Sequence, residues 1–174
     1  MTPQKRRFLP LGAGICLCAL SCLVSFSIHH IFGIIINYTA SLPRGLYRLH
    51  PLPPDIERDM LVALAVPEHV QAMVYGRRWL FKGSLLLKPV AAVAGDRIRI
   101  TDEGLSINKR YLGPVYSYDA EGLPLPVIRT SYTLKEDEVF LASSYLRSFD
   151  SRYFGPVDKK DIIAEVIPLF TFSP

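Results

Sequence analysis

Ser41 and Lys88 are the two residues whose surroundings favour nucleophilic chemistry. Ser41 lies in the segment NYTASLPRGLY, Asn37 to Tyr47, directly after a long apolar run. Lys88 has three leucines before it and the apolar residues Pro89–Val93 after it. A lysine can deprotonate a serine only when it is neutral, so its pKa must fall by units from about 10.4, and burial does this. The alternative is that Lys88 extends its ammonium to solvent from a strand edge.

A histidine-based hydrolase is a second possibility. His50 and His69 are the histidines that follow the apolar run, and no G-x-S-x-G motif is present. The missing motif argues against an α/β-hydrolase. A Ser-His-Asp triad that uses either histidine stays open, because triads have no fixed order in sequence.

The first part of the chain is typical of a membrane anchor. Lys5, Arg6 and Arg7 precede an apolar stretch, and the next charged residue is Arg44. A bilayer core is spanned by roughly 20 apolar residues in a helix, and basic residues favour the cytoplasmic side. We therefore predict a cytoplasmic tail over residues 1–7, a transmembrane helix over residues 8–36 and an extracytoplasmic domain over residues 37–174.

A cleaved signal peptide is the competing interpretation of the same stretch. Its apolar core would measure about 7–15 residues, and the apolar run here is longer, which favours a retained anchor. Cleavage would release a soluble periplasmic protein whose N-terminus lies beyond about residue 25.

The positions of the cysteines and of the charged residues argue against further classes of protein and of site. All three cysteines, Cys16, Cys18 and Cys22, lie in the apolar run, so no disulfide framework is expected in the domain and no metal site is predicted. The net charge is +4, but from residue 38 onward 17 basic residues meet 16 acidic ones. Nucleic acid is therefore not expected as a partner.

Short apolar runs separated by proline and glycine predict a mainly β domain after Tyr47. A helix is predicted over Pro67–Trp79, with Pro67 at its start and Gly76 near its end. A long loop is predicted over Gly113–Thr130, which is rich in glycine, proline and aromatic residues. The predicted strands are Met60–Val66, Ser84–Val93, Asp96–Ile100, Leu105–Asn108, Glu138–Ser143 and Ile162–Phe170.

Three sequence boxes together resemble the type I signal peptidases. Ser41-Leu42-Pro43 after an apolar run is similar to the nucleophile box, and KPVAAVAGD, Lys88 to Asp96, is similar to the lysine strand that ends in Gly-Asp. SFDSRYFGPV, Ser148 to Val157, is similar to the last box. The ending PRGLY resembles the conjugative-transfer branch, the TraF-type peptidases that mature pilins.

The resemblance implies roles for individual residues. Ser41 would be the nucleophile and Lys88 the general base. Thr39 would join the Ser41 backbone N–H in the oxyanion hole. Ser148 would orient the lysine, and Asp150 with Arg152 would form an ion pair at the site. No cofactor is implied.

Leu42 stands where methionine is common after the nucleophile, and a second departure from the pattern lies before the last box. Members that serve general secretion usually carry Gly-Asp-Asn there, whereas this chain has Ala142-Ser143-Ser144-Tyr145. This departure leaves the two central residues untouched and favours the specialised branch.

The resemblance also implies a fold and a function. The fold is an antiparallel, barrel-like sheet of the signal-peptidase type. The function is cleavage of a prepilin or another exported peptide at the periplasmic face of the bacterial inner membrane, by hydrolysis or by cyclisation. The alternative is a membrane-anchored β domain that acts without catalysis as an assembly factor of a secretion machine.

Overall fold

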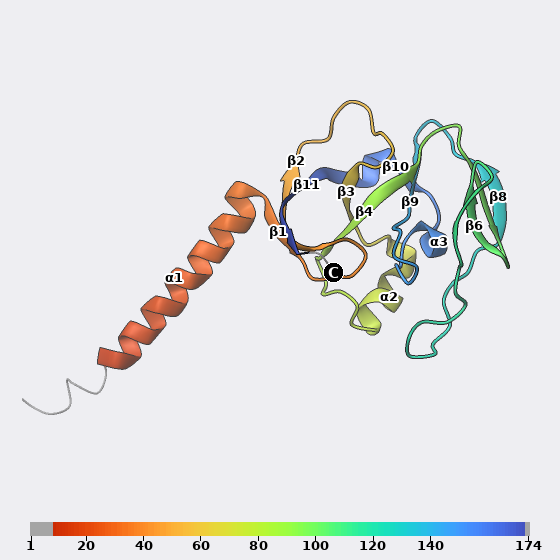
Figure 1. The fold of residues 1–174 in the computed structure, drawn as a ribbon. Helices are drawn as coiled ribbons and strands as arrows, with labels where there is room; N and C mark the ends of the chain where they lie inside the picture. Colours follow the sequence, from red (N-terminus) through yellow and green to blue (C-terminus); the bar gives the residue numbers. More distant parts are fainter. Residues whose placement is uncertain (1–8, 173–174) are drawn as a thin grey trace, which may run out of the picture. The chain divides into compact units, whose positions relative to one another are not determined.

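The computed structural model describes residues 9–172, and within α1 it describes the side chains of residues 13–24. The chain divides into two compact units, residues 1–35 and residues 36–174, and each is described by itself (Figure 1). The tail predicted over residues 1–7 lies outside the described residues.

The first unit is built on one helix. Helix α1 covers Leu9–Phe32, and Cys16, Cys18 and Cys22 are exposed on it as free thiols. Among the described residues, no helix combines the length and the apolar character needed to cross a membrane. The anchor over residues 8–36 stays a prediction.

The second unit is built on a seven-stranded sheet, which begins with β1 at the junction of the units. The strand order is β1-β2-β11-β3-β4-β9-β10, and the pairings from β2 to β10 are antiparallel. A mainly β fold is confirmed. The strands are β1 (Ile34–Asn37), β2 (Arg44–His50), β3 (Leu61–Ala65), β4 (Leu85–Ala92), β9 (Glu138–Leu141), β10 (Val157–Asp158) and β11 (Ile162–Phe172).

The last strand connects the first strands to the rest of the sheet. One end of β11 pairs with β3, and its longer remainder pairs with β2, from Glu165 opposite His50 to Phe172 opposite Arg44. Gly45 in β2 has φ +155°, and a Cβ built there would lie 2.1 Å from the Phe170 carbonyl oxygen. Only glycine allows the two backbones to approach this closely.

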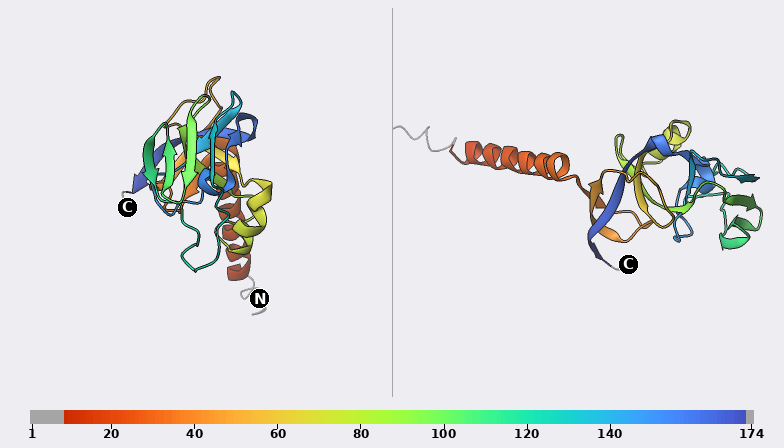
Figure 2. Two further views of the ribbon diagram at one scale, coloured as in Figure 1. Left: turned by 90° about the vertical axis from the view of Figure 1, so that its right-hand side faces the viewer. Right: turned by 90° about the horizontal axis from the view of Figure 1, so that it is seen from above.

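A four-stranded sheet lies beside β9 in Figure 1, and the right-hand view of Figure 2 shows its green and teal strands at the edge of the second unit. Its core packs Ile98, Ile100 and Leu105 against Phe140 of β9. This contact fixes the small sheet to the large one. Its strands, in the order β7-β6-β5-β8, are β5 (Arg97–Thr101), β6 (Gly104–Ile107), β7 (Arg110–Gly113) and β8 (Thr130–Thr133).

Short helices cover the larger core. Helix α2 (Glu68–Gly76) follows β3 and buries Val70 and Val74 against it, and α3 (Ser151–Phe154) precedes β10. Central β4 lies between β3 and β9 and is buried along most of its length. A side chain that points inward from β4 therefore has no route to solvent along a strand edge.

Most predicted elements are confirmed with shifted ends. Each of the six predicted strands overlaps an observed one. The observed helix α2 is shorter than the predicted helix because the chain turns at Arg78, which has φ +56°. The sequence did not predict β1, β2, β7, β8 or β10. Of these, β2 and β8 pair with strands distant in sequence, β11 and β5, whereas β7 forms a local hairpin with β6.

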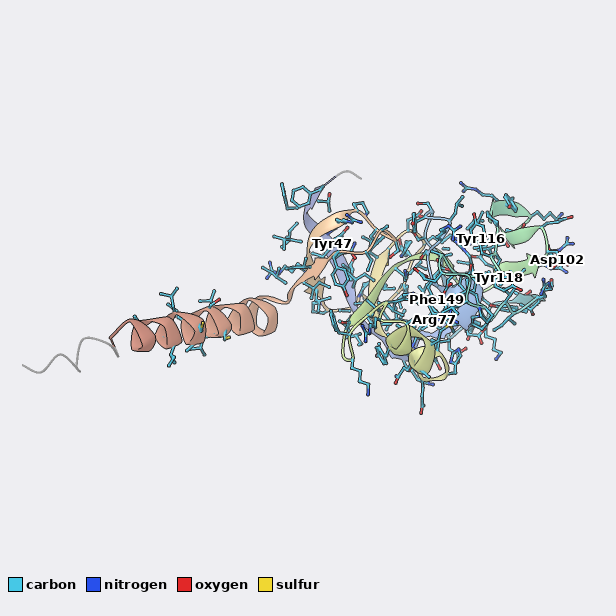
Figure 3. All side chains as sticks on the ribbon, turned by 90° about the horizontal axis from the view of Figure 1, so that it is seen from below. Tyr47, Arg77, Asp102, Tyr116, Tyr118 and Phe149 are labelled. Carbon is cyan, nitrogen blue, oxygen red and sulfur yellow. The ribbon has the colours of Figure 1, made fainter. Side chains whose placement is uncertain are left out.

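The predicted loop is confirmed between β7 and β8, and it is held in place. Arg77, directly after α2, donates to Asp119 Oδ2 and to the Pro124 carbonyl, both at 2.7 Å. Tyr118 bridges to Pro124 within the loop. Figure 3 labels Arg77 together with Tyr116 and Tyr118 of the loop.

Candidate active site

Lys88 lies at the centre of the large sheet, where β4 pairs with β3 opposite Val62. Its side chain is 4% exposed, and its ammonium donates to Ser148 Oγ at 2.9 Å. A lysine in this position does not extend to solvent from a strand edge, so that alternative is wrong.

Burial changes the acidity of Lys88. Desolvation is the largest effect and lowers its pKa, nearby Asp150 opposes it, and Arg152 adds to it. The result is a pKa of about 8 in place of 10.5. At pH 7 about one lysine in ten is then neutral, which is the state that accepts a proton.

Asp150 and Arg152 form a buried ion pair beside Lys88. Their side chains are 0% and 1% exposed, and Arg152 Nε lies 3.5 Å from Asp150 Oδ1. Asp150 caps α3 by accepting from the Arg152 backbone N–H, and it also accepts from the Ser143 N–H at 3.1 Å. Burial raises the pKa of Asp150, against the influence of Arg152 and Lys88. The pair is therefore part of the core, unlike an ordinary surface pair.

Asn37 organises the segment that carries Ser41. It is 5% exposed, and its Nδ2 donates to the carbonyls of Thr39, Leu42 and Pro43 at 3.1–3.2 Å. Its Oδ1 accepts from the Thr39 backbone N–H and hydroxyl. One buried amide thus holds the turn on both sides of Ser41.

The hydroxyls of Thr39 and Ser41 lie 3.2 Å apart. Thr39 donates its hydrogen to Asn37 Oδ1, which can only accept, so Ser41 must be the donor to Thr39 Oγ1. In this state the Thr39 hydrogen is engaged with Asn37 Oδ1 and is not available to an oxyanion. The role of Thr39 stays a prediction that requires its hydroxyl to rotate.

Ser143 connects the Ser41 segment to the lysine cluster. Its hydroxyl donates to the Ser41 carbonyl at 2.5 Å, and its own carbonyl accepts from Arg152. Both Ser41 and Lys88 are among the described residues, and no hydrogen bond joins their side chains directly. Without a bound substrate such contacts are often long, so this gap does not exclude a shared reaction.

Aromatic packing holds Ser148 and Asp150 in place. Phe149, between them in sequence, is labelled in Figure 3. It contacts Trp79, Tyr153 and Phe154 at ring centroid distances of 5.2, 5.4 and 5.9 Å. This cluster fixes the backbone from which Ser148 reaches Lys88.

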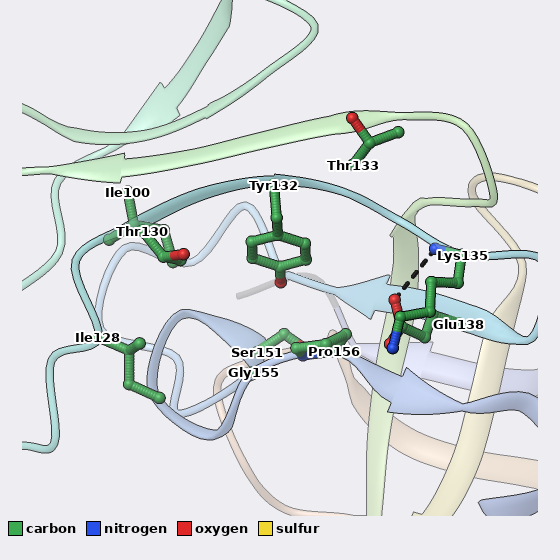
Figure 4. Close-up of a pocket in the computed structure, with 10 residues that line it drawn as sticks. All are labelled: Ile100, Ile128, Thr130, Tyr132, Thr133, Lys135, Glu138, Ser151, Gly155 and Pro156. Atoms are coloured by element: carbon green, nitrogen blue, oxygen red, sulfur yellow. Dashed lines mark hydrogen bonds and ion pairs between the residues drawn. The ribbon is translucent and has the colours of Figure 1, made fainter.

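A cavity of about 370 Å³ is lined by residues of β8, by Ser151 at the start of α3 and by Gly155 (Figure 4). Tyr132 points into it, and its buried hydroxyl has no hydrogen-bond partner within the protein. None of the six predicted site residues lines this cavity. Within the described part of the chain, no three His, Cys, Asp or Glu side chains are grouped to hold a metal.

Sequence reasoning did not find Asn37, Ser143 or Phe149. Ser143 appeared only as part of a departure from a motif. The signal available for Asn37 was a polar residue at the end of the apolar run, which did not indicate its contacts.

Lys88, with its lowered pKa, lies beside a buried ion pair, and the Ser143 hydroxyl links this cluster to the Ser41 segment. The chain belongs to the signal peptidase family, peptidase S26, whose family model matches residues 7–170. It is 36% identical over 151 residues to the conjugal transfer protein TraF of Agrobacterium tumefaciens (strain 15955), covering 82% of this chain and 85% of that protein.

Two further similarities extend the comparison. A plasmid transfer protein TraF of Escherichia coli is 34% identical over 154 residues, covering 82% of this chain and 86% of that protein. The crystal structure of a signal peptidase I from Enterococcus faecalis V583 matches with 18% identity and a TM-score of 0.39, covering 66% of this chain and 98% of that chain.

Proposed function

We propose that the protein is a serine endopeptidase in which Ser41 is the nucleophile and Lys88 the general base. The observation that carries the proposal is the fully buried Lys88, with its pKa lowered to about 8 and its ammonium on Ser148. A charged lysine destabilises the fold when it is buried. A buried lysine with a lowered pKa is therefore a candidate for a function that needs its neutral form.

The reaction has two halves. Neutral Lys88 takes the proton of the Ser41 hydroxyl, and Ser41 Oγ attacks the carbonyl carbon of the scissile peptide bond. The tetrahedral intermediate collapses as Lys88 gives the proton to the departing amine, which leaves an acyl-enzyme on Ser41. Water then releases a trimmed chain, or an amine of the same peptide releases a cyclic product.

The oxyanion would be stabilised by the Ser41 backbone N–H and the Thr39 hydroxyl. One such donor contributes roughly 2.7–4 kcal/mol to lowering the barrier. When Ser41 loses its hydrogen it no longer donates to Thr39, and Thr39 is then free to turn its own hydrogen from Asn37 to the oxyanion.

The substrate we propose is a prepilin or another exported peptide of a conjugative transfer system. The relatives named as conjugal and plasmid transfer proteins support this choice. The apolar residues before Ser41 support a single membrane anchor with the catalytic domain in the periplasm, which would keep the site near substrates that leave the same membrane.

The test is mass spectrometry of a candidate pilin co-expressed with the full chain. We expect a shortened pilin with the wild type and unprocessed pilin with Ser41→Ala and with Lys88→Ala. A product lighter than the trimmed chain by one water would identify cyclisation. Processing by both variants would overturn the proposal and favour the non-catalytic assembly factor.

The matched controls are Ser144→Ala and Lys82→Ala. Both positions are exposed and lie outside the proposed machinery. Both variants should process the pilin as the wild type does.

A further inference from the structure

Ser143 uses each of its polar groups on a partner that belongs to the site. Its N–H donates to Asp150 Oδ2 and its carbonyl accepts from Arg152. Its hydroxyl contacts the Ser41 carbonyl and the Tyr145 N–H. The residue is 4% exposed, so water does not compete for these contacts.

The hydroxyl can adopt only one orientation. The Ser41 carbonyl can only accept, and the Tyr145 N–H, at 3.0 Å, can only donate. The Ser143 hydrogen must therefore point at Ser41, and its oxygen lone pair at Tyr145.

This contact is the hydrogen bond that connects the two halves of the site. Among the described residues, no other hydrogen bond joins residues 38–43 to the chain beyond Tyr47. On the other side, the Ala142 N–H donates to the carbonyl of Pro89, the residue after Lys88. A short path thus runs from Lys88 to Ser41, through the backbone hydrogen bond of residue 142 and the side-chain hydroxyl of residue 143.

We infer that Ser143 is a positioning residue, whose hydroxyl holds the Ser41 carbonyl so that the Ser41 side chain stays within reach of Lys88. The inference rests on the proposed serine peptidase function. It gives a physical reason for the presence of Ala142-Ser143-Ser144 in place of Gly-Asp-Asn. A serine hydroxyl can donate a hydrogen bond to a carbonyl, whereas the carboxylate of an aspartate cannot.

The experiment compares Ser143→Ala with Ser143→Thr and Ser144→Ala in the full chain. Alanine removes only the hydroxyl and leaves the backbone bonds to Asp150 and Arg152 in place. We expect kcat for pilin processing to fall by at least tenfold, since small misplacements of reacting groups cost up to about 100-fold, with KM changed less than threefold. Threonine should restore most of the rate, and Ser144→Ala should match the wild type.

The pH dependence of the rate separates a positioning role of Ser143 from general damage to the site. The midpoint of the rise of the rate with pH should be the same in Ser143→Ala as in the wild type, because the Ser143 hydroxyl does not contact Lys88. A disturbed ion pair would move this midpoint, and such a shift, or an unchanged kcat, would overturn the inference.

Hydrogen–deuterium exchange gives a measurement that does not need activity. The peptide covering residues 38–46 should exchange at least fivefold faster in Ser143→Ala than in the wild type or in Ser144→Ala. Equal exchange overturns the inference even if the wild type processes no pilin. An inactive wild type with faster exchange in Ser143→Ala would instead count against the proposed function alone.

Discussion

Replacing Lys88 by methionine will remove a pH dependence from the folding stability of the protein. Methionine is unbranched and similar in length, so it fills the buried space without the charge. In the folded protein the pKa of Lys88 is lowered from 10.5 to about 8 by desolvation. In the unfolded chain it returns to its ordinary value.

The sign follows from proton binding. Between pH 8 and pH 10.5 the unfolded state binds more protons than the folded state, so stability rises with pH over this interval. Below pH 8 the full penalty applies. At 1.36 kcal/mol per pKa unit, the drop from 10.5 to about 8 corresponds to about 3 kcal/mol. At pH 10.5 only about 0.4 kcal/mol of this penalty remains.

The assay is urea unfolding of the full chain in mild detergent at pH 6 and at pH 10.5. The free energy of unfolding of the wild type is subtracted from that of Lys88→Met at each pH. This difference should be about 3 kcal/mol larger at pH 6 than at pH 10.5. Taking the difference cancels the titration of other groups, and loss of the Ser148 hydrogen bond shifts both values equally. Lys82→Met, at an exposed lysine, should give no such change. A difference for Lys88→Met that stays constant within about 1 kcal/mol would refute the lowered pKa.

Three further predictions concern activity and the fold. The log of kcat/KM should rise by about one per pH unit up to pH 8 and then level off, as the neutral fraction of Lys88 grows; a flat profile would contradict its role as base. Gly45→Ala should lower the melting temperature because its Cβ would meet the Phe170 carbonyl, whereas Gly76→Ala, with open space around it, should not. Asn37→Ala should reduce the free energy of unfolding by about 1–3 kcal/mol, measured in urea, and no loss would mean that its contacts are dispensable.

The predictable part of the fold came from local patterns. The alternating residues of β5 and the apolar runs of β3 and β4 indicated strands, whereas the apolar neighbours of Lys88 left open whether its side chain is buried or extends to solvent. These signals are local because side chains alternate between the faces of a strand.

The unpredicted part depends on distant contacts. Pro43 and Gly45 look like turn signals, yet Gly45 lies in β2 because the backbone of β11 passes close to it. The short β8, with the sequence TSYT, has little apolar character and pairs along β5. The link from Ser143 to Ser41 spans 102 positions, and nothing near either residue indicates it.

The late position of β11 in the chain determines when the site can form. The chain is synthesised from its N-terminus, and β2 leaves the ribosome long before residues 165–172, which pair with it. Pairing between such distant segments is slow, and it cannot begin until synthesis is nearly complete. In a nascent or prematurely terminated chain, β11 is therefore missing and cannot pair with β2, the strand that follows the Ser41 segment. The proposed nucleophile Ser41 would therefore gain the support of this pairing only when translation is nearly complete.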